Sequence, residues 1–416
     1  MLIQRSFNII EYFFKYLIIL IPLALIIGPA PTDIILSLLA LFIVLRSLYF
    51  KEYFYFNNIY FKVIFIFALY LIIISALSDN VKLSLESSIF YIRFILFSIS
   101  LAYFFDKYEI VFNYFFIALI ICVVFVSLDG FFQYFNGFNV FGFVSIHDGR
   151  ISGVFKEELI LGSYVSRLVP LCFFYISLKH SKSKTILLSA IFSIILFDIL
   201  IYLSGERSAF VYLLLSTIII IFLTQKLRSF RLYTFVCSIL IIIIISFINP
   251  ESKNRMIDNT LKQINFGQQG EKLRIFSEEH QDHYTTAIKM FKDSPIIGHG
   301  PKLFRELCDY EKYQTLWGCS THPHNTYVQL MSETGLIGTI PVVTFFLFII
   351  FKLFKQFVNL NFYKNKINLL SDEKIYIYLS LLISLWPLVP TGNFFGNWIN
   401  AIYFIPFAIL IRKKNE

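Results

Sequence analysis

The residues best suited to chemistry lie in the polar run from Ser320 to Leu330, which contains His322, His324 and Asn325. The run ends a long hydrophilic segment and leads directly into a strongly apolar pattern. Asn325 is a suitable N-cap for a helix that begins after it. Because histidine is the side chain that most readily exchanges a proton near neutral pH, the run predicts titratable chemistry at the start of a helix.

Three arginines are the next candidates, because a guanidinium group keeps its proton and its planar fork suits phosphate. Arg150 precedes an apolar run, Arg167 lies about two helical turns inside that run, and Arg207 begins another. An arginine at the depth of Arg167 is costly in a membrane unless it faces a polar cavity or partner. Together the three predict an anion site, and Arg305 is a weaker candidate in the hydrophilic segment.

Each arginine also has a simpler interpretation. Arg207 could anchor a helix end at the membrane interface, and Arg305 could lie on a solvated face. Arg150 and Arg167 could instead pair with a carboxylate, for which the sequence offers Glu157, Glu158 and Asp198.

The elements that must position these residues are membrane helices. The chain has 416 residues, 57% of them hydrophobic, and a mean hydropathy of +0.71. Its apolar runs are about 20 residues long, as a helix needs to cross about 30 Å of hydrocarbon. We therefore predict an all-α polytopic membrane protein with about 12 transmembrane helices, at 12–29, 33–49, 60–77, 88–105, 110–132, 158–177, 185–203, 207–224, 231–248, 325–351, 374–390 and 396–411.

The lysines and arginines between these spans predict the orientation of the chain. They gather at both termini and in alternate connections, which places both termini in the cytoplasm. The same rule accounts for the formal charge of +9 without nucleic acid. The chain then divides into an N-terminal bundle of nine spans (1–248), a large external, periplasmic loop with short helices (249–324) and three C-terminal spans (325–416).

Two further features of the large loop can be predicted. A helix is expected from Glu278 to Phe291, with Tyr284, Ala287, Ile288 and Phe291 on one side. In an oxidising compartment, Cys308 and Cys319 could form a disulfide. The other cysteines, Cys122, Cys172 and Cys237, are expected to be small buried side chains.

Several of these motifs, in this order, resemble the O-antigen ligase and polymerase superfamily. The resemblance covers 150 to about 340, and its helical membrane fold agrees with the pattern above. The motifs are Arg150 to Phe155, Leu161 to Tyr164, Gly205 to Ala209, Ala287 to Pro301 with its Pro-x-x-Gly-x-Gly turn, and His322 to Gly338 with His-x-His-Asn and Glu-x-Gly-Leu-Ile-Gly.

The resemblance implies a metal-independent, inverting glycosyltransferase of the bacterial inner (plasma) membrane. Its donor would be a glycan on polyprenyl (undecaprenyl) pyrophosphate, and its acceptor the lipid A-core or another glycan, with both lipid tails among the membrane lipids. No cofactor is expected. O-antigen ligation to lipid A-core is the first expectation, and polymerisation of the glycan is the alternative.

The same resemblance implies roles for the site residues. His324 would be the general base, and Arg207, Arg150, Arg167 and Arg305 would hold the pyrophosphate. His322 and Asn325 would orient the acceptor or the loop.

Other interpretations stay open. His324 could merely cap or pack against the loop. His322 could share a metal ion with His280 or His283, but the spacing places no third and fourth ligand, so no metal is predicted. A transporter or flippase for lipid-linked sugars ranks below the enzyme, because the sequence has no internal repeats and gathers its polar groups at one face. A structural membrane protein whose loop binds a partner ranks last.

Overall fold

The structure is a computed structural model that describes residues 2–144, 150–179, 184–264, 275–362 and 369–413. In these ranges the regular elements are helices, and one isolated bridge joins Phe138 and Val144. The α-helices are α1 (Leu2–Ile27), α2 (Pro29–Phe50), α3 (Ile59–Ala76), α4 (Val81–Ser88), α5 (Arg93–Lys107), α6 (Glu109–Asn136), α7 (Leu161–Leu178), α8 (Lys184–Leu203), α9 (Arg207–Leu223), α10 (Arg228–Ile248), α11 (Pro250–Lys253), α12 (Asn259–Gln263), α13 (Glu278–Asp293), α14 (Phe304–Leu307), α15 (Thr326–Asn361), α16 (Asp372–Ser384) and α17 (Asn397–Leu410). Short 3₁₀ turns cover Phe54–Asn57 and Gly153–Phe155, and a π-turn covers Asn254–Asp258.

The chain is a multi-pass membrane protein. Eight stretches of the described residues are long and apolar enough to cross a bilayer: Ile9–Ile27, Pro29–Phe50, Ile59–Ala76, Val81–Lys107, Glu109–Asn136, Leu161–Leu178, Arg228–Ile248 and Thr326–Asn361. Three shorter apolar helices are Leu187–Leu203, Arg207–Leu223 and Asn397–Leu410. The predicted fold class is thus confirmed, whereas the number of twelve spans and the external side of the loop stay predictions.

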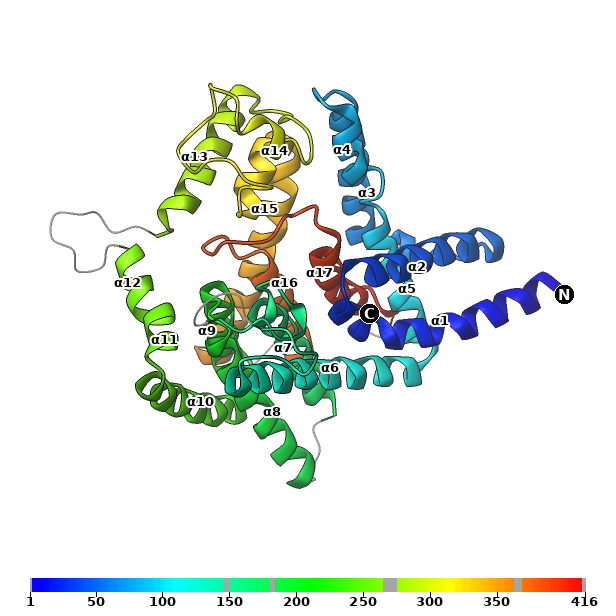
Figure 1. Ribbon diagram of the computed structural model, residues 1–416. Helices are drawn as coiled ribbons and strands as arrows, with labels where there is room; N and C mark the ends of the chain where they lie inside the picture. The colour runs from blue at the N-terminus through cyan, green and yellow to red at the C-terminus, as the bar shows by residue number, and fades with distance from the viewer. Residues whose placement is uncertain (1, 145–149, 180–183, 265–274, 363–368, 414–416) are drawn as a thin grey trace. The chain divides into compact units, whose positions relative to one another are not determined.

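Contacts group the helices of Figure 1 into two compact units. Unit 1 comprises 1–115, 275–348 and 385–416, and unit 2 comprises 116–274 and 349–384. These units are defined by packing and not by membrane topology. The topological division at residues 248 and 324 therefore stays a prediction.

In unit 1, α5 packs against both α2 and α17, and α1 packs against α2. The connection between α1 and α2 is Gly28, whose φ of 143° lies in a region that glycine adopts readily. A reversal with so short a connection keeps the two apolar helices side by side. Trp398 fixes α17 here, because its indole N–H donates to the carbonyl of Leu25 at 2.9 Å.

In unit 2, α7 packs against α8, α9 and α16, while α10 packs against α8 and α9. A buried ion pair joins two of these helices: Arg231 Nη1 lies 2.7 Å from Asp198 Oδ2, and both side chains are 1% exposed. The Nε of Arg231 also donates to the hydroxyl of Thr217 at 3.1 Å. A buried charge is tolerated when it is paired and hydrogen-bonded in this way. Arg231, at the start of the predicted span 231–248, is therefore part of the helix packing.

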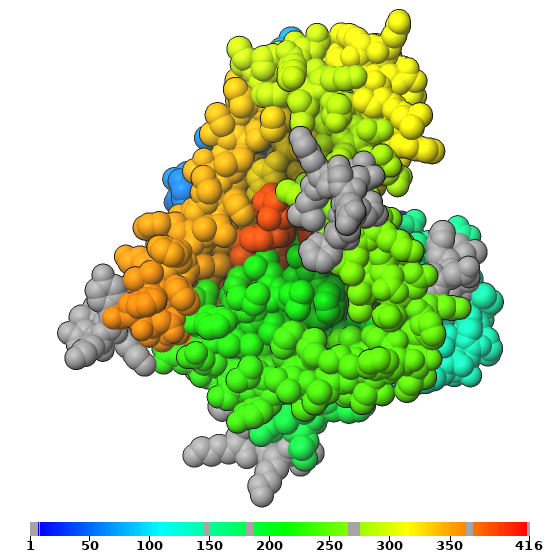
Figure 2. Space-filling view, turned by 90° about the vertical axis from the view of Figure 1, so that its left-hand side faces the viewer, coloured from blue at the N-terminus to red at the C-terminus, as the bar shows by residue number. Residues whose placement is uncertain are grey.

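The long hydrophilic segment is divided between the units. Its first part, with α11 and α12, belongs to unit 2, and its second part, with α13 and α14, belongs to unit 1. In Figure 2 the second part, yellow-green to yellow, forms one continuous surface up to the start of α15. Its core is a cluster of side chains from α13, α14 and the following loop: Ala287, Met290, Leu303, Phe304, Leu307, Cys308 and Tyr313.

Two local predictions need correction. The helix expected from Glu278 is present as α13, but its buried face carries His283, Tyr284, Ala287 and Met290, whereas Ile288 is 38% exposed. Cys237 was expected to be buried and is exposed on α10. A membrane helix presents apolar side chains to lipid as well as to the protein, so an apolar run does not tell which of its faces is covered.

Candidate active site

His324 lies between the loop of unit 1 and the first turn of α15. The side-chain oxygen of Asn325 accepts hydrogen bonds from the backbone N–H groups of Tyr327 at 3.0 Å and Val328 at 3.2 Å. This N-cap satisfies two backbone donors at the helix start, and it confirms the predicted capping. His324 itself has φ 54°, a left-handed conformation that is unfavourable for a residue with a Cβ. The backbone N–H of Thr391 donates to the carbonyl of His324 at 2.8 Å and helps to hold it there.

A turn that precedes α17 supports this helix start from the other side. Asn325 donates through its amide to the carbonyl of Pro387 at 2.9 Å. Farther along α15, the amide of Gln329 donates to Asn393 at 2.8 Å and to the buried carboxylate of Glu333 at 3.0 Å. Glu333 also accepts from the backbone N–H of Phe304 in α14 at 3.1 Å. These contacts join the turn before α17, α15 and α14, and so fix the backbone next to His324.

Four imidazole rings lie close together at the start of α15. The ring centre of His324 lies 4.1 Å from that of His322, 5.3 Å from that of His283 and 5.5 Å from that of His280. The rings of His280 and His283 are 6.0 Å apart on α13. Their spacing of three residues places both on one side of that helix. The structure therefore brings together two pairs of histidines that are about 40 residues apart in the chain.

The surroundings lower the pKa of three of these imidazoles. Burial, reinforced by His322, His280 and His283, lowers the pKa of His324 to about 3. Burial also lowers the pKa of His322 to about 4; a hydrogen bond to the carbonyl of Thr391 opposes this shift, and the positive charge of Arg305 adds to it. For His283 burial lowers the pKa as well, against the acidic neighbours Glu279 and Asp282. Desolvation penalises the imidazolium form and leaves a lone pair able to accept a proton.

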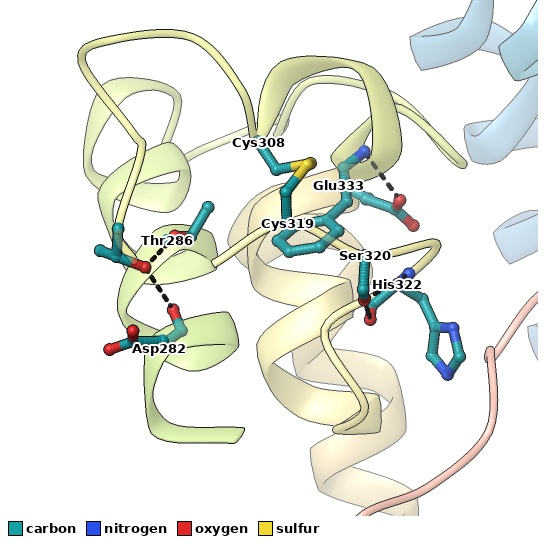
Figure 3. The surroundings of a disulfide bond; sticks show 9 residues. Asp282, Thr286, Cys308, Cys319, Ser320, His322 and Glu333 are labelled. Carbon is teal, nitrogen blue, oxygen red and sulfur yellow. Dashed lines mark hydrogen bonds between the residues drawn. A yellow bond between two sulfur atoms is a disulfide. The ribbon is translucent and has the colours of Figure 1, made fainter. Parts of the chain in front are cut away.

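A disulfide and short polar contacts fix the loop that carries His322 (Figure 3). Cys308 and Cys319 are joined, with their Cα atoms 5.0 Å apart, and Cys308 is fully buried. The hydroxyls of Thr286 and Thr315 lie 3.0 Å apart, and Thr315 donates to the carbonyl of Asp282 at 3.3 Å. The disulfide closes the chain on one side of the core, while the threonines attach it to α13. This arrangement limits the freedom of the loop from which His322 and His324 project.

The two glycine-rich motifs of unit 1 form a single junction. α15 is interrupted at Gly335, which has φ 61° and ψ −166°. Four backbone hydrogen bonds join this interruption to the turn after α13: His299 N–H to Ser332 O (3.1 Å), Gly300 N–H to Glu333 O (2.8 Å), Leu336 N–H to Pro295 O (2.9 Å) and Ile337 N–H to Ile296 O (3.2 Å). A Cβ on Gly298 would lie 2.5 Å from the backbone nitrogen of Thr334. Only glycine permits this approach of two backbones.

Guanidinium groups gather in unit 2. Arg150 and Arg255 are the charged groups that act on Arg207, and both repel it. Burial lowers the pKa of Arg150, which is attracted by Glu206 and repelled by Arg255. Arg207 donates through Nη1 to Gln263. Its Nε and Nη2 are buried and have no hydrogen-bond partner among the described residues. Clustered cations with an unused pair of donors are suited to an anion with several oxygen atoms.

Glu206 is a negative charge next to these arginines, and its carboxylate is also hydrogen-bonded to the start of α7. Its carboxylate accepts the backbone N–H groups of Gly162 at 2.6 Å and Ser163 at 3.1 Å, at the start of α7. A Cβ on Gly162 would contact the hydroxyl of Ser204. The Leu161 to Tyr164 and Gly205 to Ala209 motifs are therefore two sides of one contact, which places Arg207 at the first position of α9.

The remaining predicted arginines occupy different surroundings. Arg167 is buried in unit 2, where it donates to the carbonyl of Ser163 at 3.2 Å and to the hydroxyl of Tyr212 at 3.4 Å. The suggested alternative partner Asp198 is paired with Arg231 instead. Arg305 lies in unit 1 and acts electrostatically on His322. It is thus associated with the histidines and not with the other arginines.

The described residues thus form two groups, one in each unit. Unit 1 holds His322, His324, Asn325, Arg305 and the disulfide, and unit 2 holds Arg150, Arg167 and Arg207. The sequence interpretation missed Arg255, because a charged residue after the Asn249-Pro250 helix stop resembles any solvated loop residue. It named His280 and His283 only as partners in a metal pair. Their three-residue spacing on a predicted helix was the available signal that they act together.

The motifs of both units lie partly within a region that matches a known family. Residues 188–343 match the family model described as O-antigen ligase. This match supports membership of the O-antigen ligase superfamily. The match begins in α8 and extends past the interruption of α15, so it includes Arg207, Arg255 and the four clustered histidines. No curated protein matches the chain significantly. The family is one of glycosyltransferase-like membrane enzymes, of ligase or polymerase type, which act on lipid-linked glycans.

Proposed function

We propose that this protein is an O-antigen ligase, which moves a glycan from polyprenyl (undecaprenyl) pyrophosphate to a sugar of the lipid A-core. Membership of the superfamily supports a glycosyl transfer of this general kind. The observation that carries the proposal is the position of His324 at the start of α15, where the cap of Asn325 and the hydrogen bond from Thr391 hold it. A neutral imidazole can take a proton from a hydroxyl group without first losing one.

In the proposed reaction His324 is the general base. The acceptor hydroxyl attacks the anomeric carbon, its proton passes to the free nitrogen of His324, and the bond from that carbon to the pyrophosphate oxygen breaks. The electron pair of that bond leaves with the pyrophosphate. A single displacement of this kind inverts the anomeric configuration. His322 and Asn325 are proposed to orient the loop or the acceptor.

The pyrophosphate is proposed to bind the guanidinium groups of Arg207 and Arg150, and we add Arg255 to them. Three guanidinium groups outnumber the one carboxylate of Glu206, whose oxygens are engaged by α7. The buried Nε and Nη2 of Arg207 supply a fork for two phosphate oxygens. Preorganised positive charge stabilises a developing anion, as a metal ion does in other transferases, so the transfer is proposed to be metal-independent. Arg167 and Arg305 stay predicted contributors.

The surroundings proposed for the reaction follow from the same assignment. We place the protein in the bacterial inner membrane, with both termini cytoplasmic and residues 249–324 in the periplasm. The Cys308–Cys319 disulfide supports this orientation, because such bonds persist in oxidising compartments.

The test is transfer by the purified protein. Labelled lipid-linked glycan and lipid A-core would be incubated with the full chain in detergent, and the product analysed for a new glycosidic bond and its anomeric configuration. Transfer with inversion is expected. A flippase would give no transfer, and retention of configuration would exclude the single displacement.

The polymerase alternative is distinguished by the product in cells. A cell that lacks a ligase accumulates long lipid-linked polymer, whereas a cell that lacks a polymerase adds a single repeat unit to its core. We expect accumulation of polymer when this gene is removed, and a core with a single repeat would favour the polymerase.

A further inference from the structure

The four-histidine cluster has a property that the transfer reaction does not require. A single general base needs one imidazole, but His280, His283, His322 and His324 lie together. His283 is 4% exposed, and its Nδ1 is buried without a hydrogen-bond partner in the described part of the chain. A buried polar atom without a partner is costly, unless a ligand satisfies it.

The spacing of the rings suits a metal ion. With metal–nitrogen distances of about 2.0–2.1 Å and tetrahedral angles, two imidazoles on one ion have ring centres about 5 Å apart. The observed separations are 5.3 Å for His283 and His324, 5.5 Å for His280 and His324, and 6.0 Å for His280 and His283. His322 lies closer, with its ring centre 4.1 Å from that of His324, but its Nδ1 is 3.0 Å from the hydroxyl of Thr321 and its Nε2 3.4 Å from the carbonyl of Thr391.

The surroundings of the rings also favour a cation. Nδ1 of His280 lies 2.6 Å from the hydroxyl of Ser277, the kind of outer contact that metal-bound histidines make. The charged groups that act on His283 are Glu279 and Asp282, both acidic. Arg305 acts on His322, and it is not among the charged groups that act on His283.

The rings must turn to close around an ion. Among the described residues, Cys308, Asp309 and Cys319 form the one group of three potential ligands with their ligand atoms within 4.8 Å of one another, and both sulfur atoms of that group are in the disulfide. Rotation about side-chain bonds moves an imidazole nitrogen without moving the backbone. Imidazole ligands select zinc, copper and nickel over magnesium or calcium.

We propose that His280, His283 and His324 form a binding site for a divalent transition metal ion of the zinc class, and that the bound ion inhibits transfer. An ion on His324 occupies the lone pair that would accept the proton of the acceptor hydroxyl, so metal binding and general-base action exclude each other. The inhibitory half rests on the proposed function, whereas the site itself does not.

The test of the site is direct binding of Zn²⁺ by the full-length protein in detergent. Protein stripped with a chelator would compete with a chromophoric zinc indicator. One ion per chain is expected, and the His280→Gln/His283→Gln double variant should bind at least about 100-fold more weakly. His299→Gln is the matched control: it lies in the same loop, with its ring 5.8 Å from Tyr313, and should bind as the wild type does.

A second measurement uses the wild-type protein alone, so its result does not depend on whether the double variant folds. Co²⁺ bound to the wild-type protein should show the visible absorption of a low-coordinate nitrogen site, which Zn²⁺ displaces. Absence of saturable binding, or equal binding by the double variant, would overturn the site.

The inhibitory half is tested by transfer. Zn²⁺ should stop transfer by the wild type, and a chelator should restore it. A zinc-saturated protein that transfers at the metal-free rate would overturn the inhibition and leave the site intact. Inactivity of the metal-free protein would count against the proposed function instead.

Discussion

Replacement of His324 by asparagine separates catalysis from folding. Position 324 has φ 54°, and asparagine tolerates this left-handed region better than alanine or most other residues do. His324→Asn should therefore keep the backbone of the helix start, with the hydrogen bond from Thr391 to its carbonyl. Asparagine has no group that accepts a proton near neutral pH, so the general base is lost.

The size of the effect follows from the role. General-base catalysis contributes about 10²–10⁴-fold, equivalent to about 3–5 kcal/mol of barrier at 1.36 kcal/mol for each tenfold. We expect kcat for labelled glycan transfer by the metal-free protein to fall by this factor, with little change in KM for the donor. His299→Asn is the control, since that ring contacts the carbonyl of Met290 and lies outside the cluster. A folded His324→Asn protein that transfers at close to the wild-type rate would refute the assignment.

Four further outcomes are expected. Arg207→Lys keeps the charge but loses the two-pronged donor, so transfer should fall by about tenfold or more; near-normal activity would indicate a helix anchor. Arg255→Gln should raise the concentration of inorganic pyrophosphate that inhibits transfer by half, and an unchanged value would remove Arg255 from the site. Cys308→Ser should lower the free energy of unfolding by up to about 3 kcal/mol, seen as a lower thermal midpoint that reductant no longer changes. Because the folded pKa of His324 is lowered from 6.5 to about 3, the metal-free enzyme should keep its base unprotonated from pH 7 down to about 5; loss of half the rate near pH 6.5 would contradict this.

The sequence predicted the features that depend on neighbouring residues. Apolar length gave the membrane helices, and the position of Asn325 before an apolar run gave its cap. The helix at Glu278 was also predictable from local composition and pattern. Each of these features is determined within a few turns of one helix.

Contacts between distant segments were not predictable in the same way. The meeting of His280 with His324 depends on how α13 packs against the start of α15, and no local pattern encodes that. The low pKa of His324 also depends on such contacts, because its causes are burial and the three other imidazoles. The pairing of Asp198 with Arg231 likewise depends on which faces of α8 and α10 meet.

The backbone junction between Gly298 and Gly335 has a consequence for protein engineering. The turn after α13 supplies donors and acceptors that the interrupted α15 lacks, so neither segment has a complete set of partners alone. A chimera that takes its hydrophilic segment from another superfamily member should fold only if residues 295–300 and 332–337 come from the same parent. The two stretches act as one structural unit, although more than 30 residues separate them in the chain.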